Sequence, residues 1–118
     1  MILQGSARDR SVREEKGALV SSPTHAVHVR MKSKLSHDEI VRIMTERAPE
    51  FRALDGLEQK YYLHDPETGE YGGFYVWRSL DDVIQYRASD LAASIAAAYQ
   101  GVAAPEVTVY EIVMPLRS

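Results

Sequence analysis

The spacing of hydrophobic positions changes several times along the chain, and the first regular pattern is an alternation. In the segment HAVHVRMK, residues 25–32, apolar and polar residues take turns. A period of two is typical of a β-strand with one apolar face, which Val27, Val29 and Met31 would form here. The opposite face of this strand would carry Ala26, His28 and Arg30.

A helical pattern follows this strand. Ser36 and Glu39 have the spacing of a capping box, in which each side chain pairs with the backbone of the other residue at a helix start. Apolar residues then recur every three or four positions as far as Phe51, which predicts an amphipathic helix. Pro49 interrupts the pattern and predicts a kink or a restart, and Gly56 is expected to end the helix.

The next two segments, LEQKYYLH and YGGFYVW, are separated by the turn-forming residues DPETG and predict a β-hairpin. If the residues that flank PETG face each other across the turn, Tyr62 lies opposite Gly73. Lys60 then lies opposite Tyr75. A glycine opposite a tyrosine leaves room for the aromatic ring.

The C-terminal third predicts a second helical region and a last strand. Ser79 is placed to cap a helix, Ser89 to cap its continuation LAASIAAAYQ, and Gly101 to stop it. The segment EVTVYEIVM, residues 106–114, has the composition of a strand. The order of elements is therefore β-α-β-β-α-β. It predicts an α+β protein with a ferredoxin-like antiparallel sheet and helices on one face.

The last strand is apolar on both faces, with Val107, Val109 and Val113 on one and Tyr110, Ile112 and Met114 on the other. Helices on one side of a sheet cover only one of these faces, so the other needs a second cover. The simplest cover is a second copy of the chain, and we therefore expect a homodimer.

Length and charge narrow the class of protein. The 118 residues fit one small domain, expected at residues 24–118. Residues 1–23 are charged and lack periodicity, which predicts a flexible N-terminal extension or, alternatively, a short helix or an arm on a partner. A net charge of −3 argues against a nucleic-acid partner, and no apolar run approaches the roughly 20 residues that cross a membrane. Without cysteine or a signal-like N-terminus, we expect a cytoplasmic protein with no membrane partner.

Three segments, GLEQKYYL, GGFYVWRSLDDVIQY and VTVYEIVMPL, give the chain a resemblance to the putative mono-oxygenase family of the dimeric α+β barrel superfamily. The resemblance extends from about His25 to Leu116. It implies a homodimer whose two sheets face each other, with a small-molecule cavity between sheet and helices in each subunit. The better-studied relatives oxidise aromatic polyketides without metal or flavin, or bind and degrade haem.

The resemblance also assigns roles to positions. The pocket tryptophan that ends the third strand in these relatives corresponds to Trp77. Haem-degrading relatives carry an asparagine where this chain has His28, and their haem-ligating histidine would fall near Tyr86 or Arg87, where this chain has none. Some polyketide oxygenases carry an asparagine at the position of Gly73. These departures argue against haem, and we expect no cofactor.

Candidate site residues come from the elements that would surround such a cavity. His28, in the middle of a central strand, is the candidate base because imidazole exchanges protons near neutral pH. Tyr62 and Tyr75 are candidate hydrogen-bond donors to a substrate oxygen. No metal site is predicted, because the histidines do not gather on one face. The candidate substrate-binding residues are Trp77, Tyr86 and Tyr110.

Strand parity places these aromatic residues on one side of the sheet. Tyr62, Tyr75 and Trp77 are expected to share a face and to wall the pocket. Phe74 and Val76 would anchor the same strand in the opposite layer, with the apolar residues of the first strand. Either the aromatic face looks into the dimer barrel, or a bulge at the Gly-Gly pair changes the register. The plain alternative is that the rings fill the core.

The expected function is that of a cofactor-independent monooxygenase acting on a small aromatic substrate of the quinol or polyketide kind. A phenol or anthrone-like acid can form an electron-rich anion that reduces O₂ itself. The protein then has to bind the substrate, hold a base and exclude water. The alternative is a non-catalytic small-molecule-binding or interaction protein of the same fold.

Overall fold

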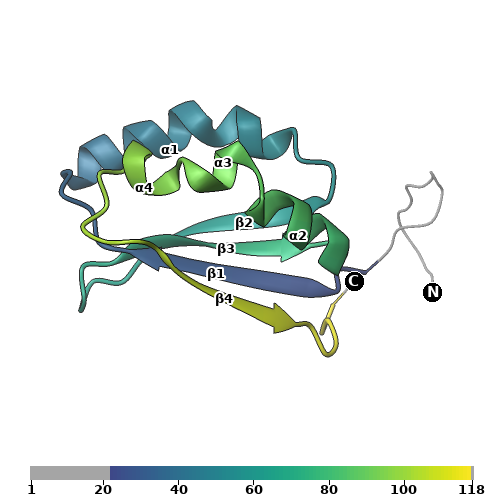
Figure 1. Ribbon diagram of the computed structural model, residues 1–118. Helices are drawn as coiled ribbons and strands as arrows, with labels where there is room; N and C mark the ends of the chain where they lie inside the picture. Colours follow the sequence, from purple (N-terminus) through teal and green to yellow (C-terminus); the bar gives the residue numbers. More distant parts are fainter. Residues whose placement is uncertain (1–21, 118) are drawn as a thin grey trace.

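A computed structural model describes residues 22–117 of the chain. Four antiparallel strands form one sheet in the order β2-β3-β1-β4, and all helices lie on one side of it (Figure 1). The strands are β1 (His25–Met31), β2 (Leu57–His64), β3 (Tyr71–Trp77) and β4 (Glu106–Glu111). The helices are α1 (His37–Arg52), α2 (Leu80–Arg87), α3 (Asp90–Ala93) and α4 (Ile95–Ala98). This arrangement confirms the predicted α+β, ferredoxin-like fold; the predicted N-terminal extension lies, up to residue 21, outside the described residues.

Helix α1 begins as the sequence predicts and ends earlier. The Ser36 hydroxyl accepts from the backbone N–H of Glu39, and the Glu39 carboxylate accepts from the backbone N–H of Ser36, at 3.2 and 3.0 Å. The helix does not restart at Pro49, because this proline lies in the last turn and removes only one backbone hydrogen bond there. The helix ends at Arg52 rather than at Gly56.

The second helical region is shorter and more broken than its alanine-rich sequence suggests. Ser79 and Ser89 accept from the backbone N–H groups three residues onward, which confirms both predicted caps. Ser94 separates α3 from α4, so the continuation is two single turns rather than one helix. After α4 the residue with a left-handed backbone is Gln100 (φ 48°), directly before the predicted stop at Gly101.

The hairpin register is as predicted, with Tyr62 opposite Gly73 and Lys60 opposite Tyr75. The pairing of β1 with β3 is different from expectation. Val27 lies opposite Tyr75, so the apolar face of β1 and the aromatic face of β3 are the same face. The prediction that they lie on opposite sides of the sheet is therefore wrong. An irregularity in pairing does occur, but between Leu57 and Gln59 on β2 rather than at the glycine pair.

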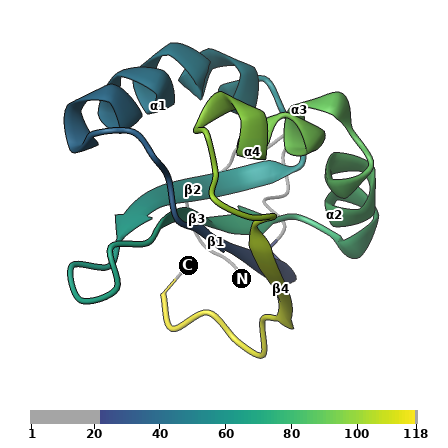
Figure 2. The ribbon, with the colours of Figure 1, turned by 60° about the vertical axis from the view of Figure 1, so that its left-hand side comes forward.

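We call the sheet face covered by the helices the inner face, and the other the outer face. Figure 2 shows the helices on the inner side of the sheet and the C-terminal segment after β4 on the other side. The inner face carries Val27, Val29, Met31, Lys60, Tyr62, Gly73, Tyr75 and Trp77. The outer face carries His28, Arg30, Tyr61, Leu63, Phe74, Val76 and Tyr110.

The core lies between the inner face and the helices. Trp77 is 1% exposed and Tyr75 is 2% exposed, and their rings contact those of Phe51 from α1 and Tyr86 from α2. Phe74 on the outer face is only half-buried. We predicted that Phe74 lies in the core and that Trp77 lines a pocket. The structure instead places Trp77 in the core and Phe74 on the outer face.

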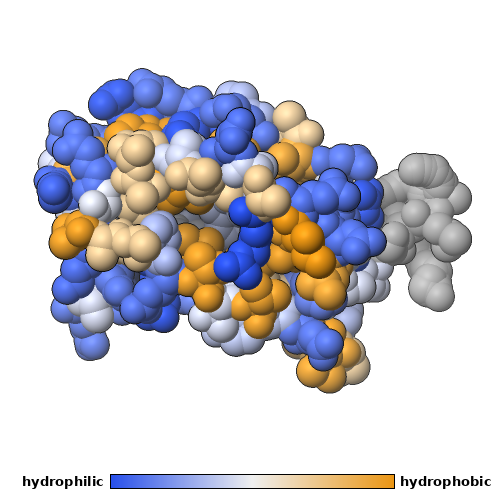
Figure 3. All heavy atoms as spheres, viewed as in Figure 1, coloured by the Kyte–Doolittle hydropathy of each residue, from blue (hydrophilic) through white to orange (hydrophobic). Residues whose placement is uncertain are grey.

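Strand β4 ends three residues earlier than predicted, and both of its faces are partly exposed to solvent. Val109 on the inner side is 37% exposed and Tyr110 on the outer side is 47% exposed. Figure 3 shows apolar side chains around a hollow between the helical layer and β4. An open groove there is lined by Val27, Val29, Tyr86, Ile95 and Val107, among others.

None of the helices within residues 22–117 is both long and apolar enough to span a bilayer.

Candidate functional site

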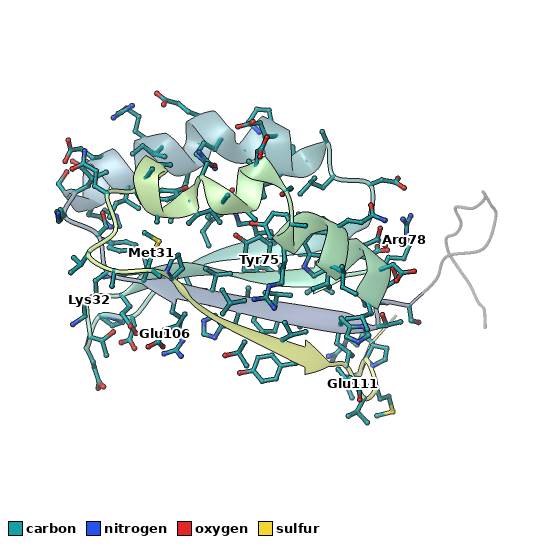
Figure 4. All side chains as sticks on the ribbon, viewed as in Figure 1. Met31, Lys32, Tyr75, Arg78, Glu106 and Glu111 are labelled. Atoms are coloured by element: carbon teal, nitrogen blue, oxygen red, sulfur yellow. The ribbon has the colours of Figure 1, made fainter. Side chains whose placement is uncertain are left out.

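The inner face holds a small, partly open cavity of about 30 Å³ between β1, β2 and β3 on one side and α1 and α4 on the other. Such a volume holds a water molecule or two. The apolar part of its wall comes mostly from Val29, Met31, Ile40, Met44, Phe51 and Ile95. The polar side chains of the wall are Ser33, Lys60, Tyr62, Tyr71, Tyr75 and Tyr99. In Figure 4 Tyr75 lies between sheet and helices, whereas Glu106 lies on the opposite side of the sheet.

Lys60 points from β2 into a cage of aromatic rings. Its Nζ lies 3.3 Å from the ring centroid of Phe51, 4.4 Å from that of Tyr62 and 4.5 Å from that of Tyr75. The faces of aromatic rings attract a cation, by about 2 kcal/mol where water is excluded. The rings therefore hold the amino group at the cavity and favour its charged form.

Gly73 makes room for this arrangement on the neighbouring strand. A Cβ atom at this position would lie 2.8 Å from Cε1 of Tyr75 and 3.1 Å from Cε of Lys60. Both distances are shorter than ordinary carbon contacts, so a side chain here would displace the ring or the lysine stem. The glycine predicted to leave space for a ring thus accommodates the cage of Lys60.

The amino group of Lys60 titrates near neutral pH. Burial, and to a smaller extent the charge of Arg47, lower the pKa of Lys60 to about 7. In the described part of the chain no ion pair joins Lys60 to a carboxylate. The amine and ammonium forms are therefore both populated at neutral pH.

Arg47 brings a second cation to the same region from α1. One terminal nitrogen of its guanidinium donates to the hydroxyl of Ser94 at 2.8 Å and to the carbonyl of Leu91 at 3.4 Å. Its Nε is buried and has no hydrogen-bond partner. An unpaired buried donor is costly, and here it marks a place where an acceptor would be favourable.

The tyrosines around the cavity are held in their protonated form. Burial raises the pKa of Tyr62 and Tyr75, and it raises that of Tyr99 to about 12. The hydroxyl of Tyr86 donates to that of Tyr75 at 3.4 Å, and burial raises the pKa of Tyr86 as well. Neutral phenol groups can donate hydrogen bonds, so these hydroxyls are suited to stabilise an oxygen anion.

The cavity shares part of its wall with a groove between α1 and β2. The groove is open and has a volume of about 370 Å³, and Phe51, Lys60 and Tyr62 line both the groove and the cavity. Lys60 and Tyr62 are the two polar members of this shared wall. The long lysine stem and the exposed tyrosine can swing outward without disturbing the core.

A cluster of two histidines surrounds Tyr71, a residue of the cavity wall. Nδ1 of His37 and the hydroxyl of Tyr71 are 2.8 Å apart, and the ring of His64 stacks on that of Tyr71 at 4.2 Å. Tyr71 belongs to the walls of both the inner cavity and a depression on the outer face. Within residues 22–117 no three histidine, aspartate or glutamate side chains are grouped as a metal site would need.

The predicted site residues fall into three groups. Tyr62 and Tyr75 lie at the cavity, together as predicted. Trp77 and Tyr86 lie behind Tyr75 in the core and are not part of the cavity wall. His28 and Tyr110 lie on the outer face, in a depression of about 500 Å³ that also includes Arg30. The structure therefore does not bring His28 together with Tyr62 and Tyr75 within one subunit.

Sequence reasoning missed Lys60 and Arg47 as site residues, although the signal for both was present. Lys60 is opposite Tyr75 in the predicted register, so it occupies an inward position of a strand. Arg47 follows Ile40 and Met44 at helical spacing, on the apolar side of α1. A charged residue at an inward position of each of two adjacent elements is the pattern that would have found them.

Comparison with known proteins places the chain in a family and a fold. The family described as "Putative mono-oxygenase ydhR" matches residues 25–117. No curated protein matches the sequence. A protein of unknown function from Nitrosomonas europaea, NE2512, shares 17% identity over 79% of this chain and 92% of its own, with a TM-score of 0.66.

Two further solved structures have the same fold. SnoaB, a cofactor-independent oxygenase from Streptomyces nogalater, shares 15% identity over 82% of this chain and 100% of its own, with a TM-score of 0.64. A putative antibiotic biosynthesis monooxygenase from Caulobacter crescentus shares 16% identity over 78% and 92% of the two chains, also with a TM-score of 0.64. The chain belongs to the ydhR family of putative mono-oxygenases, within the superfamily that its sequence resembles.

Proposed function

We propose that this protein is a cofactor-independent monooxygenase that acts on a small aromatic substrate of the quinol or polyketide kind. The observation that carries the proposal is the inner cavity, whose wall combines aromatic rings with ionisable groups. Membership of the mono-oxygenase family supports the general reaction. The fold shared with SnoaB, a cofactor-independent oxygenase, supports chemistry without a cofactor.

The reaction needs a substrate that can donate electrons itself. A phenol or anthrone loses a proton and forms an electron-rich anion, which passes electrons to O₂. A ring CH₂ then becomes C=O with one oxygen atom, and the other oxygen atom leaves as water. The protein contributes a dry site, a proton acceptor and donors to the anion, and Tyr62 and Tyr75 are suited to be these donors.

The size of the cavity sets a condition on binding. A volume of about 30 Å³ does not admit an aromatic ring, so the ligand has to displace side chains of the wall. Lys60 and Tyr62, which separate the cavity from the groove along α1 and β2, are the residues that would move. We infer that the substrate enters there and takes the place that these side chains fill in the free protein.

We also propose that the protein is a homodimer formed through the outer face. Tyr61, Leu63 and Tyr110 are exposed on this face, and the half-buried Phe74 and Val76 lie beside them. A sheet face with this apolar content is unusual for a surface in contact with water. A second copy packed on this face would also place His28 in the interface. The role of His28 as a base stays a prediction.

A non-catalytic binding protein is the second candidate. It is favoured by the small volume of the cavity and by the hydrogen bond between the hydroxyls of Tyr75 and Tyr86 in the free protein. Such a protein would bind small aromatic compounds without turnover.

Oxygen uptake separates the two candidates. The protein is incubated with quinol-type and anthrone-type compounds in an oxygen electrode, with and without a metal chelator. Uptake that depends on the protein and survives chelation supports the monooxygenase. A ligand-induced rise in melting temperature without uptake supports the binding protein, and neither effect would contradict both.

A further inference from the structure

We propose that Lys60 is the base of the inner cavity: its amine takes the proton of a bound phenol or enol, and the oxygen anion so formed is held between the Lys60 ammonium and the Arg47 guanidinium. The inference rests on the proposed function and names the proton acceptor and the substrate class for the same site. The step is balanced within the complex. The O–H bond breaks, an N–H bond forms on Nζ, and the electron pair stays on the substrate oxygen.

The position of Lys60 is the first argument. Its side chain belongs to the walls of both the inner cavity and the open groove between α1 and β2. A ligand that enters through this gap meets Nζ directly. After the reaction, the same position lets the ammonium return its proton to water in the groove.

The charges around Lys60 are the second argument. From α1 the charge of Arg47 acts on it, and from β3 the ring of Tyr75 lies against it. Arg52 and Tyr86 lie one neighbour further out, since their charges and hydroxyls act on Tyr62 and Tyr75. On β2 its neighbours are Tyr62 and, on the groove side, Glu58. Tyr99, which follows α4, completes the wall. No ion pair with a carboxylate within the described residues involves Lys60, so a ligand anion would be its counter-charge.

Arg47 is the third argument. Its Nε is buried without a hydrogen-bond partner, while one terminal nitrogen is fixed by Ser94 and Leu91. The charge of this guanidinium acts on Lys60, Tyr62 and Tyr99 of the cavity wall, so Arg47 lies close to the site. A phenolate or enolate oxygen would be an acceptor for its Nε–H, whereas a cationic or purely apolar ligand would leave the donor unpaired.

The acidity of Lys60 fits this role. Burial holds the pKa of the amino group at about 7, so much of it is unprotonated at pH 8 and can accept a proton. The rings of Phe51, Tyr62 and Tyr75 then stabilise the ammonium that forms. The same cage that holds the amine before the transfer therefore holds the cation after it.

The test observes the proton transfer directly and without turnover. 2-Naphthol absorbs at longer wavelength when ionised, and a phenol whose pKa is about 10 is only about 1% ionised in solution at pH 8. Titration of the probe with wild-type protein at pH 8, without O₂, should raise the ionised fraction of the bound probe well above the roughly 1% found in solution, because the neighbouring cations stabilise the oxygen anion. Lys60→Met should lose this spectral change. Lys34→Met, which removes an exposed lysine before α1, should keep it.

Each outcome has a defined meaning. Binding with an un-ionised spectrum in the wild type, an ionised spectrum in Lys60→Met, or no binding of the probe would overturn the assignment of Lys60. If Lys60→Met does not fold, Lys60→Gln gives the same comparison. The proposed function is tested separately by O₂ uptake. If the bound probe is ionised but the protein takes up no O₂ with any quinol or anthrone, the proposed function fails and the assignment of Lys60 stands.

Discussion

The two faces of one four-stranded sheet differ in what covers them, and the difference locates both the core and the candidate site. The inner face is covered by helices, buries Trp77 and Tyr75, and includes the cavity with Lys60. Within residues 22–117 no helix covers the outer face, and Tyr110 on it is nearly half exposed. Alternate residues of the same strand, such as Phe74 and Tyr75, therefore belong to different environments.

This comparison teaches that aromatic content alone does not mark a pocket. Both faces carry aromatic residues, but only the inner face combines them with two cations and an unpaired buried donor. Burying the charges of Lys60 and Arg47 costs free energy unless they are paired. These two cations, rather than the aromatic rings, distinguish the candidate site from an ordinary core.

The largest expected effect separates two aromatic residues of β3. Trp77→Ala should lower the free energy of unfolding by about 3–5 kcal/mol, because it removes a fully buried ring. Phe74→Ala should cost only about 1 kcal/mol, because the half-buried ring on the outer face gives up less burial. Urea unfolding of both variants in dilute protein measures this. Equal losses would mean that the outer face is as much a core as the inner one.

The next effect is the pH dependence that Lys60 gives to stability. The unfolded chain holds the Lys60 proton up to the ordinary pKa of 10.5, whereas the folded protein releases it near 7. The unfolded state thus binds more protons between these values, and the unfolding free energy of the wild type should rise from pH 7 to pH 9. The slope is at most about 1.4 kcal/mol per pH unit, and partial access of water to Lys60 reduces it.

Lys60→Met should lack this rise, because methionine has no proton to release. The measurement is urea unfolding at pH 7, 8 and 9. Lys34→Met serves as the matched control, since an exposed lysine should leave the wild-type slope in place. A wild-type slope in Lys60→Met would show that Lys60 titrates normally.

A smaller effect concerns self-association through the outer face. Tyr110→Lys should weaken the dimer about tenfold or more, because it introduces a charge into the proposed interface. Ile84→Lys changes a residue of similar exposure on α2, outside this face, and should not affect association. Sedimentation equilibrium over a range of concentrations gives both constants. A monomeric wild type at low micromolar concentration would argue against the dimer altogether.

The smallest effect is expected for the N-terminal segment. Deletion of residues 1–21 should leave the melting temperature within a few degrees, because the segment has few apolar residues to bury. Scanning calorimetry of the truncated and full-length chains measures this. A large drop would show that the segment docks on the domain.

Local patterns were sufficient to predict most of the fold. The caps at Ser36, Ser79 and Ser89 and the hairpin register with Tyr62 opposite Gly73 depend on neighbours close in sequence, and all are confirmed. The break at Ser94 was missed, because the alanines around it favour helix on their own. Leu91 and Ala92 pack against the core and Ile95 is buried, and such tertiary contacts can override propensity.

Local patterns could not predict which residues of different strands share a face of the sheet. Which residue of β1 lies opposite Tyr75 depends on a pairing between strands some 50 positions apart, and both β1 and β3 offer apolar residues at alternating positions. A shift of one residue exchanges the two faces without changing the local pattern. The candidate base His28 was therefore assigned to the same pocket as Tyr75, whereas the structure places it on the other side of the sheet.

The location of a bound phenol tests the central claim, that the inner face carries the function. A crystal structure of the protein with 2-naphthol at pH 8 would show the ligand directly. We expect the ring in the enlarged cavity between α1 and β2, with Lys60 moved aside and the naphthol oxygen within hydrogen-bonding distance of Nζ of Lys60 and Nε of Arg47. A ligand bound only on the outer face, beside His28 and Tyr110, with the inner cavity unchanged, would contradict the account.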